Sequence, residues 1–439
     1  MPFRYLVAWG LLLLMAPAVA DQPRLSDEAL ADQVDRLVGR LESDESLVRD
    51  GAQQELLELA GDTWQSGDRL LAALPHPDPA MPVALREAVA GLRSKISKHI
   101  ADTALKASRV SLDLFKTPLA DVFKQIEQQT GNRLLDYREQ FGQDAQPRPI
   151  TLTVKDKPFW EAMDAVLDQG ELGVYAYAGE SALAVVNREP DDGPRRGAAC
   201  YAGPLRFEAT QVVASRSLRK PNQRSLDVKV EIAWEPRLEP IAISQQMSDV
   251  EARSEGGVAL SLLRPEQEIN LETQQGTQSV EVSLPLVLPE RKTEKIASLK
   301  GKVNVLAPGR RATFRFEGLD AIKQPAEQQQ GGVSVTLNRM VQNGVIWELH
   351  MRLKVSGAGD ALASHRGWVF QNPSHLENAK GEVIEHAGFE TTMQTQDEVG
   401  LAYLFELEDG PKDLTWVYET PASIVEFPVE WELGGIELP

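Results

Sequence analysis

VSLDLFKTPLADVFKQIEQQTGNRLLDY, residues 110–137, and ITLTVKDKPFWEAMDAVLDQGELGVYAYAGESALAVV, residues 150–186, are two copies of one small unit. In each copy a strand alternates apolar and polar side chains, a turn with a proline follows, and an amphipathic helix comes next. The apolar rows of the strands are Val110, Leu112 and Leu114, and Ile150, Leu152 and Val154. The duplication predicts a compact module built from two strand-helix units.

The two helices have clear start and stop signals. Each is expected to begin at a capping side chain with a proline in its first turn, and to end at a left-handed glycine. These residues are Thr117, Pro118 and Gly131 in the first copy, and Asp156, Pro158 and Gly170 in the second. The apolar stripes are Leu119, Val122, Phe123 and Ile126, and Phe159, Ala162, Met163, Val166 and Leu167.

The duplicated segment resembles the short N-terminal domain shared by secretins and TonB-dependent receptors. The resemblance rests on VSLDL followed by PL, a helix and TG, and then on ITL, PFWEA and a helix that ends in leucine. It implies a βαβ-type module over residues 107–188 that lies in the cell envelope, binds protein or glycan partners and carries no catalytic residues. No pore-forming domain is predicted after it, so a secretin or receptor as such is not expected.

The first twenty residues predict an export signal. Arg4 supplies a basic start, residues 6–15 form an apolar run too short to span a bilayer, and Ala18-Val19-Ala20 offers a cleavage site. An uncleaved membrane anchor is the alternative. After cleavage no other segment predicts a membrane span, so we expect a periplasmic or extracellular protein of the cell envelope.

Composition narrows the class of protein further. The chain has 439 residues, enough for several domains, and a net charge of −19 that disfavours binding to nucleic acid. Its single cysteine, Cys200, excludes an intramolecular disulfide. Stability in an oxidising compartment must therefore come from packed cores.

Residues 21–106 predict helices in two pairs. The first pair is broken by polar residues 43–45, and the second by Pro75, Pro77 and Pro79, which remove donors and clash with the preceding turn. The pairs resemble HEAT repeats, and a plain bundle of helical hairpins is the alternative.

The second half of the chain predicts antiparallel β structure. Residues 189–203 read as a linker, and strands of period two then follow one another with polar turns between them. We expect two Ig-like sandwiches, 204–325 and 331–439, joined by a flexible polar stretch, with one larger sandwich as the alternative. The fold class is therefore multidomain α+β: helical hairpins, a βαβ module and two antiparallel sandwiches.

No residue of the sequence is predicted to be catalytic, to bind a cofactor or to bind a metal ion. Metal, nucleotide and nucleophile motifs are missing from the sequence, and loop histidines 365, 375 and 386 read more simply as surface residues than as ligands. Among the tryptophans of the β region, Trp368 is the best candidate for an exposed contact with a sugar or a protein, whereas Trp347 and Trp416 are expected in the core.

These observations predict an exported, non-catalytic envelope protein that acts as a protein-binding scaffold, or as an accessory component of a secretion, uptake or envelope assembly. Its partners are expected to be envelope proteins, with a glycan as a second class, and no cofactor is expected. The expected mechanism is acceptance of a partner's strand at an exposed sheet edge. The sequence leaves the oligomeric state open. The alternative is a secreted hydrolase or carbohydrate-active protein with its site between domains.

Overall fold

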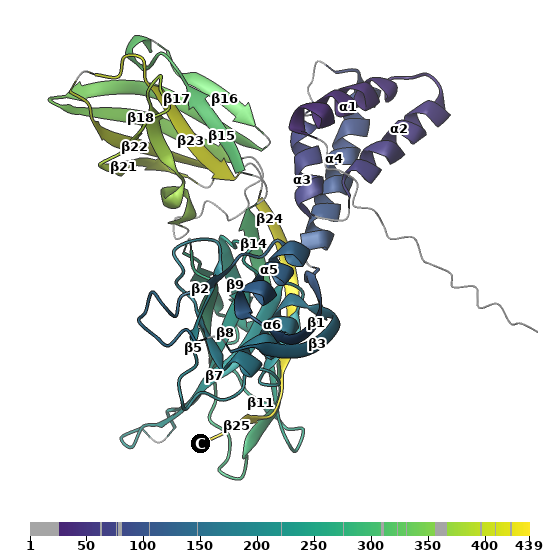
Figure 1. Ribbon diagram of the computed structural model, residues 1–439, viewed down its shortest axis with the longest axis vertical. Helices are drawn as coiled ribbons and strands as arrows, with labels where there is room; N and C mark the ends of the chain where they lie inside the picture. Colours follow the sequence, from purple (N-terminus) through teal and green to yellow (C-terminus); the bar gives the residue numbers. More distant parts are fainter. Residues whose placement is uncertain are drawn as a thin grey trace, which may run out of the picture.

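The computed structural model describes residues 26–439 apart from 62–63, 76, 78–80, 105, 147, 221, 275, 309–310, 323, 331, 356–366, 396, 409 and 422–423. The chain is a β-rich multidomain α+β protein (Figure 1). The expected export signal, 1–20, lies outside the described residues. Among the helices that are described, none combines the length and the apolar character that crossing a bilayer requires.

Four helices form the N-terminal region. They are α1 (Asp27–Arg40), α2 (Ser46–Leu59), α3 (Trp64–Ala73) and α4 (Val83–Ala104). The Ser26 hydroxyl caps α1 by accepting a hydrogen bond from the Ala29 amide, and the predicted break at 43–45 separates α1 from α2. Leucines and other apolar side chains of all four helices share one core, whereas Leu47 is 84% exposed.

The duplicated segment forms a module of two helices and two small sheets. Its elements are β1 (Arg109–Thr117), α5 (Leu119–Thr130), β2 (Leu134–Asp136), β3 (Ile150–Pro158), α6 (Phe159–Gly170), β4 (Leu172–Tyr175) and β5 (Leu183–Asn187). Strands β1 and β3 pair antiparallel as a two-stranded ribbon, and the other sheet has the order β2-β5-β4. The predicted apolar stripes of both helices are buried in the core of the module.

The two copies are related by an approximate twofold axis between β1 and β3, with equivalent residues 40 apart. The Ser111 hydroxyl accepts a hydrogen bond from the Asp156 amide, and the Thr151 hydroxyl accepts one from the Lys116 amide. Lys116 and Asp156 both have left-handed backbone, with φ of 49° and 50°. The same reciprocal bonds on both strands confirm that the segment is an internal repeat.

The helix boundaries differ in detail from those predicted. Pro118 and Pro158 are themselves the N-cap residues, and no side chain caps either helix. Gly131 has the expected left-handed conformation, but in the second copy that role falls to Glu171. Gly170 lies inside the helix, where an added Cβ would approach Leu172 Cδ1 to 2.9 Å, so close packing explains this glycine.

The first β domain consists of two sheets that enclose one core. One sheet has the order β13-β8-β7-β6, and the other contains β11-β10-β14-β9-β12 with β24 and β25 paired to β14. The strands of the first sheet are β6 (Ala199–Ala202), β7 (Leu205–Arg216), β8 (Arg224–Trp234) and β13 (Ser279–Leu286). Those of the second are β9 (Ala242–Gln246), β10 (Glu251–Ser254), β11 (Ala259–Leu260), β12 (Glu268–Glu272), β14 (Lys295–Pro308), β24 (Ile424–Leu433) and β25 (Ile436–Glu437), with 3₁₀-helix η1 (Met247–Asp249) between β9 and β10.

The second β domain also has two sheets around one core, with the orders β15-β23-β19-β20 and β16-β17-β18-β22-β21. Its first sheet is built from β15 (Arg311–Phe316), β19 (Ser374–Glu377), β20 (Val383–Glu385) and β23 (Thr415–Pro421). Its second is built from β16 (Ala326–Gln330), β17 (Val333–Asn343), β18 (Ile346–Val355), β21 (Gly388–Gln394) and β22 (Glu398–Glu406). The 3₁₀-helices are η2 (Leu319–Ala321) and η3 (Gly367–Gln371).

The second β domain is inserted into the first. Strand β24 pairs with β14 over ten residues, from Leu299 opposite Leu433 to Pro308 opposite Ile424, so the chain returns to the first domain after β23. The expected boundaries at 325 and 331 are therefore wrong, because β15 already belongs to the second domain. The stretch expected to be a flexible junction forms β16, and the end of the expected linker 189–203 forms β6.

Candidate interaction surface

The β1–β3 ribbon presents one face to solvent. Its inner row packs on the helices, while the alternate side chains, among them Ser111, Asp113, Thr151 and Thr153, are exposed. The ribbon formed by β1 and β3 lies at the side of the module (Figure 1). Phe115 on this ribbon is 78% exposed, with the Lys116 ammonium 5.6 Å from its ring centroid. An exposed aromatic ring beside a cation is a suitable anchor for a partner.

The edges of this ribbon are closed by two equivalent glutamines. The Gln129 amide accepts a hydrogen bond from Ser111 N at 2.8 Å and donates one to Ser111 O at 3.0 Å. Gln169 makes the same pair of bonds to the amide and carbonyl of Thr151. These glutamine side chains already form hydrogen bonds with the outward-facing backbone groups of Ser111 and Thr151. A further strand therefore could not pair with the ribbon at these two residues. The face of the ribbon is thus more accessible to a partner than its edges.

An ion pair crosses one end of the ribbon. Arg109 Nη2 lies 2.9 Å from Asp156 Oδ2, and both side chains are more than half exposed. The hydrogen bond to Asp156 raises the pKa of Arg109, and the same bond lowers the pKa of Asp156. This pair lies beside the positive-φ turn before α6, whereas Phe115 lies toward the other end of β1, on the same exposed face as Asp113.

Helix α6 attaches the module to the first β domain through a buried ion pair. Asp164 of α6 and Arg206 of β7 are both fully buried, and Arg206 Nε lies 2.7 Å from Asp164 Oδ2. The Tyr201 hydroxyl also donates to Asp164, at 2.8 Å, and Arg206 Nη1 lies 2.6 Å from Glu208. Burial alone would lower the pKa of Arg206, but the Asp164 and Glu208 carboxylates raise it instead. Removing either partner would leave a buried charge without its nearest counter-charge on the other side of the interface.

A second buried carboxylate joins the ends of the first copy to the same domain. Glu235, which follows β8, is fully buried and accepts hydrogen bonds from Ser108 N at 2.8 Å and Asn132 Nδ2 at 2.9 Å. Arg237 Nε lies 2.7 Å from the same carboxylate, and the Arg237 amide donates to Asn132 Oδ1. The carboxylate thus has both a charge partner and several donors, as burial of an ion requires.

A third connection joins the loop after β4 to the loop before β13. Gln278 N donates to Ala176 O at 2.9 Å, and Gly179 N donates to Gly276 O at 3.1 Å. Gly276 has φ of 77°, and a Cβ there would lie 2.4 Å from the carbonyl carbon of Gly179, so only glycine fits. Three separate contacts therefore hold the module on the first β domain.

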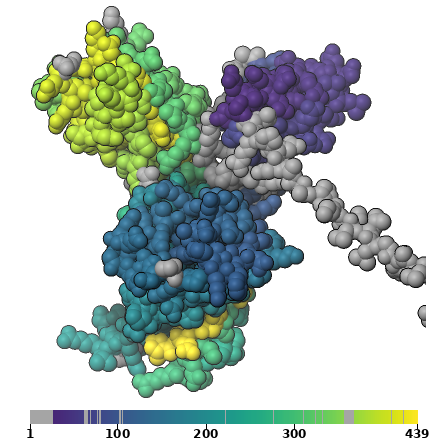
Figure 2. All heavy atoms as spheres, in the orientation of Figure 1, coloured from purple at the N-terminus to yellow at the C-terminus, as the bar shows by residue number. Residues whose placement is uncertain are grey.

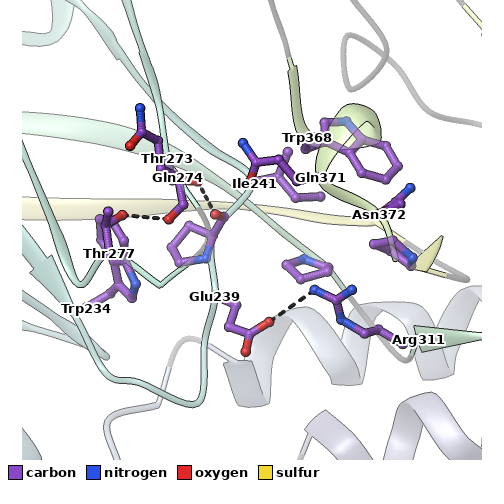
Figure 3. A pocket seen from close by; sticks show the side chains of 13 residues that line it. Trp234, Glu239, Ile241, Thr273, Gln274, Thr277, Arg311, Trp368, Gln371 and Asn372 are labelled. Atoms are coloured by element: carbon purple, nitrogen blue, oxygen red, sulfur yellow. Dashed lines mark hydrogen bonds and ion pairs between the residues drawn. The ribbon is translucent and has the colours of Figure 1, made fainter. Parts of the chain in front are cut away.

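A small cavity lies between the two β domains (Figure 3). Its volume is ≈ 60 Å³, well below the roughly 300–1,000 Å³ of typical small-molecule sites. Its carboxylate, Glu239, has left-handed backbone with φ of 42° and lies 3.5 Å from Arg311 at the start of the second domain. Glu239 and Arg311, the acid and the base of the cavity, pair with each other across the two domains. The pair therefore acts as a contact between the domains.

Trp368 is not an exposed contact, contrary to expectation. It is 8% exposed, lies on η3 in the core of the second β domain and lines the cavity between the domains (Figure 3). Trp416 is fully buried and Trp347 packs partly buried against the same core. Residues Gly367–Gln371 form η3, and this helical turn buries Trp368 and Val369.

The described histidines of the second β domain do not form a metal site. Among the described residues, no group of three or more histidine, cysteine, aspartate or glutamate side chains is placed to hold a metal ion. His375 Nε2 lies 3.1 Å from Glu377, and His386 packs against the rings of Tyr403 and Phe389. His365 lies outside the described residues.

Comparisons with known proteins add little. No family model and no curated protein matches the chain. Among solved structures, a conserved domain protein from Bacillus anthracis aligns with a TM-score of 0.17 and 7% identity, over 54% of this chain and 89% of that one. A likeness at this level carries no argument about fold or function.

Sequence reasoning missed the polar residues that attach the module. Asp164 interrupts an otherwise apolar helix face, and that interruption is a usable signal for a buried ion pair. Gln129 and Gln169 stand at equivalent places in the two copies, and their equivalence is visible once the copies are aligned at a spacing of 40.

Proposed function

We propose that this protein is an exported, non-catalytic scaffold of the cell envelope that holds a partner protein on the outer face of its β1–β3 ribbon. It would serve as an accessory component of a secretion, uptake or envelope assembly. The observation that carries the proposal is the ribbon itself: its face is free and bears the exposed Phe115, while the opposite side of the module is attached to the first β domain.

The resemblance of the module to the secretin and TonB-receptor domain supports the choice of compartment and of partner. Consistent with that proposal, we infer that α1–α4 form HEAT-like hairpins and that the β domains are Ig-like sandwiches. In this arrangement the first β domain holds the module in a fixed orientation, because Asp164, Arg206 and Glu235 are buried in the interface between the two. A fixed orientation reduces the entropy that is lost when a partner binds.

The mechanism is surface complementarity across the ribbon face. Strand addition at the ribbon edges is disfavoured at Ser111 and Thr151 by the two glutamines. Phe115 would enter an apolar pocket of the partner, and the hydroxyls of Thr151 and Thr153 would form the polar surroundings of this contact.

The test is capture of partners from an envelope extract with the intact protein and with Phe115→Asp. Deleting the whole module is unsuitable because it would remove the partners that the module supplies to the buried Arg206 and Glu235, namely Asp164, Ser108 and Asn132. The matched control is Val345→Asp, which changes a similarly exposed residue, at 64%, near the β17–β18 turn. We expect Phe115→Asp to lose the partner and Val345→Asp to retain it, with circular dichroism unchanged in both. Retention of the partner by Phe115→Asp would contradict the proposal.

A further inference from the structure

The outer face of the five-stranded sheet of the second β domain forms a shallow trough. Its volume is ≈ 870 Å³, and its lining comes from strands β16, β17, β18, β21 and β22 together with Pro325. This volume falls within the roughly 300–1,000 Å³ of ligand sites. The sheet lies in the upper left of Figure 1.

The trough carries several basic side chains in a protein whose net charge is −19. His350, Arg352 and Lys354 alternate along β18 with the buried Leu349, Met351 and Leu353, and so point to the outer face. A β-bulge between Leu337 and Arg339 adds a residue to β17 and places Arg339 opposite His350, also in the lining.

The cations of the trough are not all neutralised. Arg352 lies 3.6 Å from Glu398, and Lys354 lies 3.9 Å from Asp397, so both are long, exposed pairs of low strength. The Glu327 carboxylate accepts a hydrogen bond from Ser334. Within the described residues no carboxylate pairs with Arg339, which is exposed. The trough therefore has one guanidinium that no carboxylate of the described residues pairs with, and two further cations that are held only in long, weak pairs.

Hydroxyl and amide groups separate these charges. Ser334, Thr336 and Asn338 of β17 and Thr392 of β21 belong to the lining, whereas its apolar members are few. Protein interfaces typically have an apolar centre rich in Tyr, Trp and Phe, and the lining of this trough contains none of these three residue types. A sheet face also has no free backbone groups with which to bind an extended peptide.

From this combination we infer that the trough binds an anionic polysaccharide, whose carboxylates contact Arg339, Arg352 and Lys354 and whose hydroxyls bond to the serine, threonine and asparagine side chains. This site is separate from the ribbon on which the proposed function rests. It would give the protein a second attachment, to acidic glycan, alongside its protein partner.

The experiment measures binding of the intact protein to polygalacturonate, with neutral dextran of similar length and poly-glutamate as comparison polymers. We expect saturable binding of polygalacturonate that weakens about tenfold between about 0.05 and 0.5 M salt, because exposed charges are screened over this range. Arg339→Ala combined with Arg352→Ala should lower the affinity about tenfold or more, since hydrogen bonds to charged groups are lost.

The matched control is Arg253→Ala combined with Lys292→Ala, which removes the same charge from exposed positions of the first β domain. It should leave the affinity within about twofold, on the ground that distant surface charges act weakly. Phe115→Asp should bind polygalacturonate normally, which separates this inference from the proposed function. Absence of saturable binding, equal binding of dextran or of poly-glutamate, or an equal loss in the control variant would overturn the inference.

Discussion

The two copies of the duplicated unit have the same backbone and different surroundings. In the first copy, α5 buries only the stripe Leu119, Val122, Phe123 and Ile126 and leaves its other side toward solvent. In the second copy, α6 is buried on almost every side, including the charged Asp164. Lys124, the residue of α5 equivalent to Asp164, is exposed.

This difference shows that two copies of one fold can have different surroundings in a single small module. The second copy gives up its solvent-facing side to attach to the first β domain, and it needs a buried ion pair to do so. The first copy supplies Phe115 on the ribbon and keeps this residue accessible. We therefore expect equivalent substitutions in the two copies to change the free energy of unfolding unequally at positions that contact the first β domain. At positions that contact only the ribbon, we expect the two changes to be equal.

The largest difference in the free energy of unfolding is expected between Asp164→Ala and Lys124→Ala. Asp164→Ala leaves Arg206 buried without its main partner and should lower the free energy of unfolding by about 3–5 kcal/mol. Lys124→Ala changes an exposed helix residue and should alter the free energy of unfolding by less than about 0.5 kcal/mol. Urea denaturation of both variants measures the difference. Similar losses in the two variants would show that the copies are not distinguished by attachment.

A smaller effect is expected at the contact that the first copy makes with the β domain. Glu235→Ala removes the acceptor for Ser108, Asn132 and Arg237 and should cost about 2–3 kcal/mol, because buried donors lose their bonds. The control is Glu281→Ala, whose carboxylate forms an exposed pair with Lys229 and should contribute at most about 1 kcal/mol. If Glu235→Ala proves as mild as the control under the same denaturation, attachment through the ends of the first copy is not supported.

The smallest effect on stability is expected at the two equivalent glutamines, and it tests the twofold relation between the copies. Gln129→Ala and Gln169→Ala each remove two equivalent hydrogen bonds to the ribbon and should each cost about 1 kcal/mol. Hydrogen exchange should show faster exchange of the Ser111 amide in the first variant and of the Thr151 amide in the second. A large loss of protection at one site only would mean that the twofold relation does not extend to the edges.

Local pattern was enough to predict much of this molecule. The alternation in 226–234 and 345–355 predicts long strands, and β8 and β18 lie there. The stripes of α5 and α6, and the prolines before them, likewise predicted helices whose interior faces are buried as expected. These features depend on residues close in sequence, so periodicity alone reveals them.

Partners distant in sequence were beyond such reasoning. The alternating pattern of β24 fits either β domain equally, and only its pairing with β14 decides that it closes the first. Asp164 and Trp368 show the same limit, since the burial of a charge or of a loop tryptophan depends on a segment many residues away. The polar composition of 324–332 suggested a linker, whereas β16 is an edge strand, where polar residues are tolerated.

The most direct test of the account is crosslinking from the ribbon face in the cell envelope. One variant carries a photoreactive residue in place of Phe115, and a second variant carries it in place of Val345. After activation by light, the proteins attached to each variant are identified by mass spectrometry. If the ribbon is the docking face, a specific protein should be attached from position 115 and not from position 345. The same set of proteins from both positions, or none from position 115, would contradict the claim that the ribbon is the docking face.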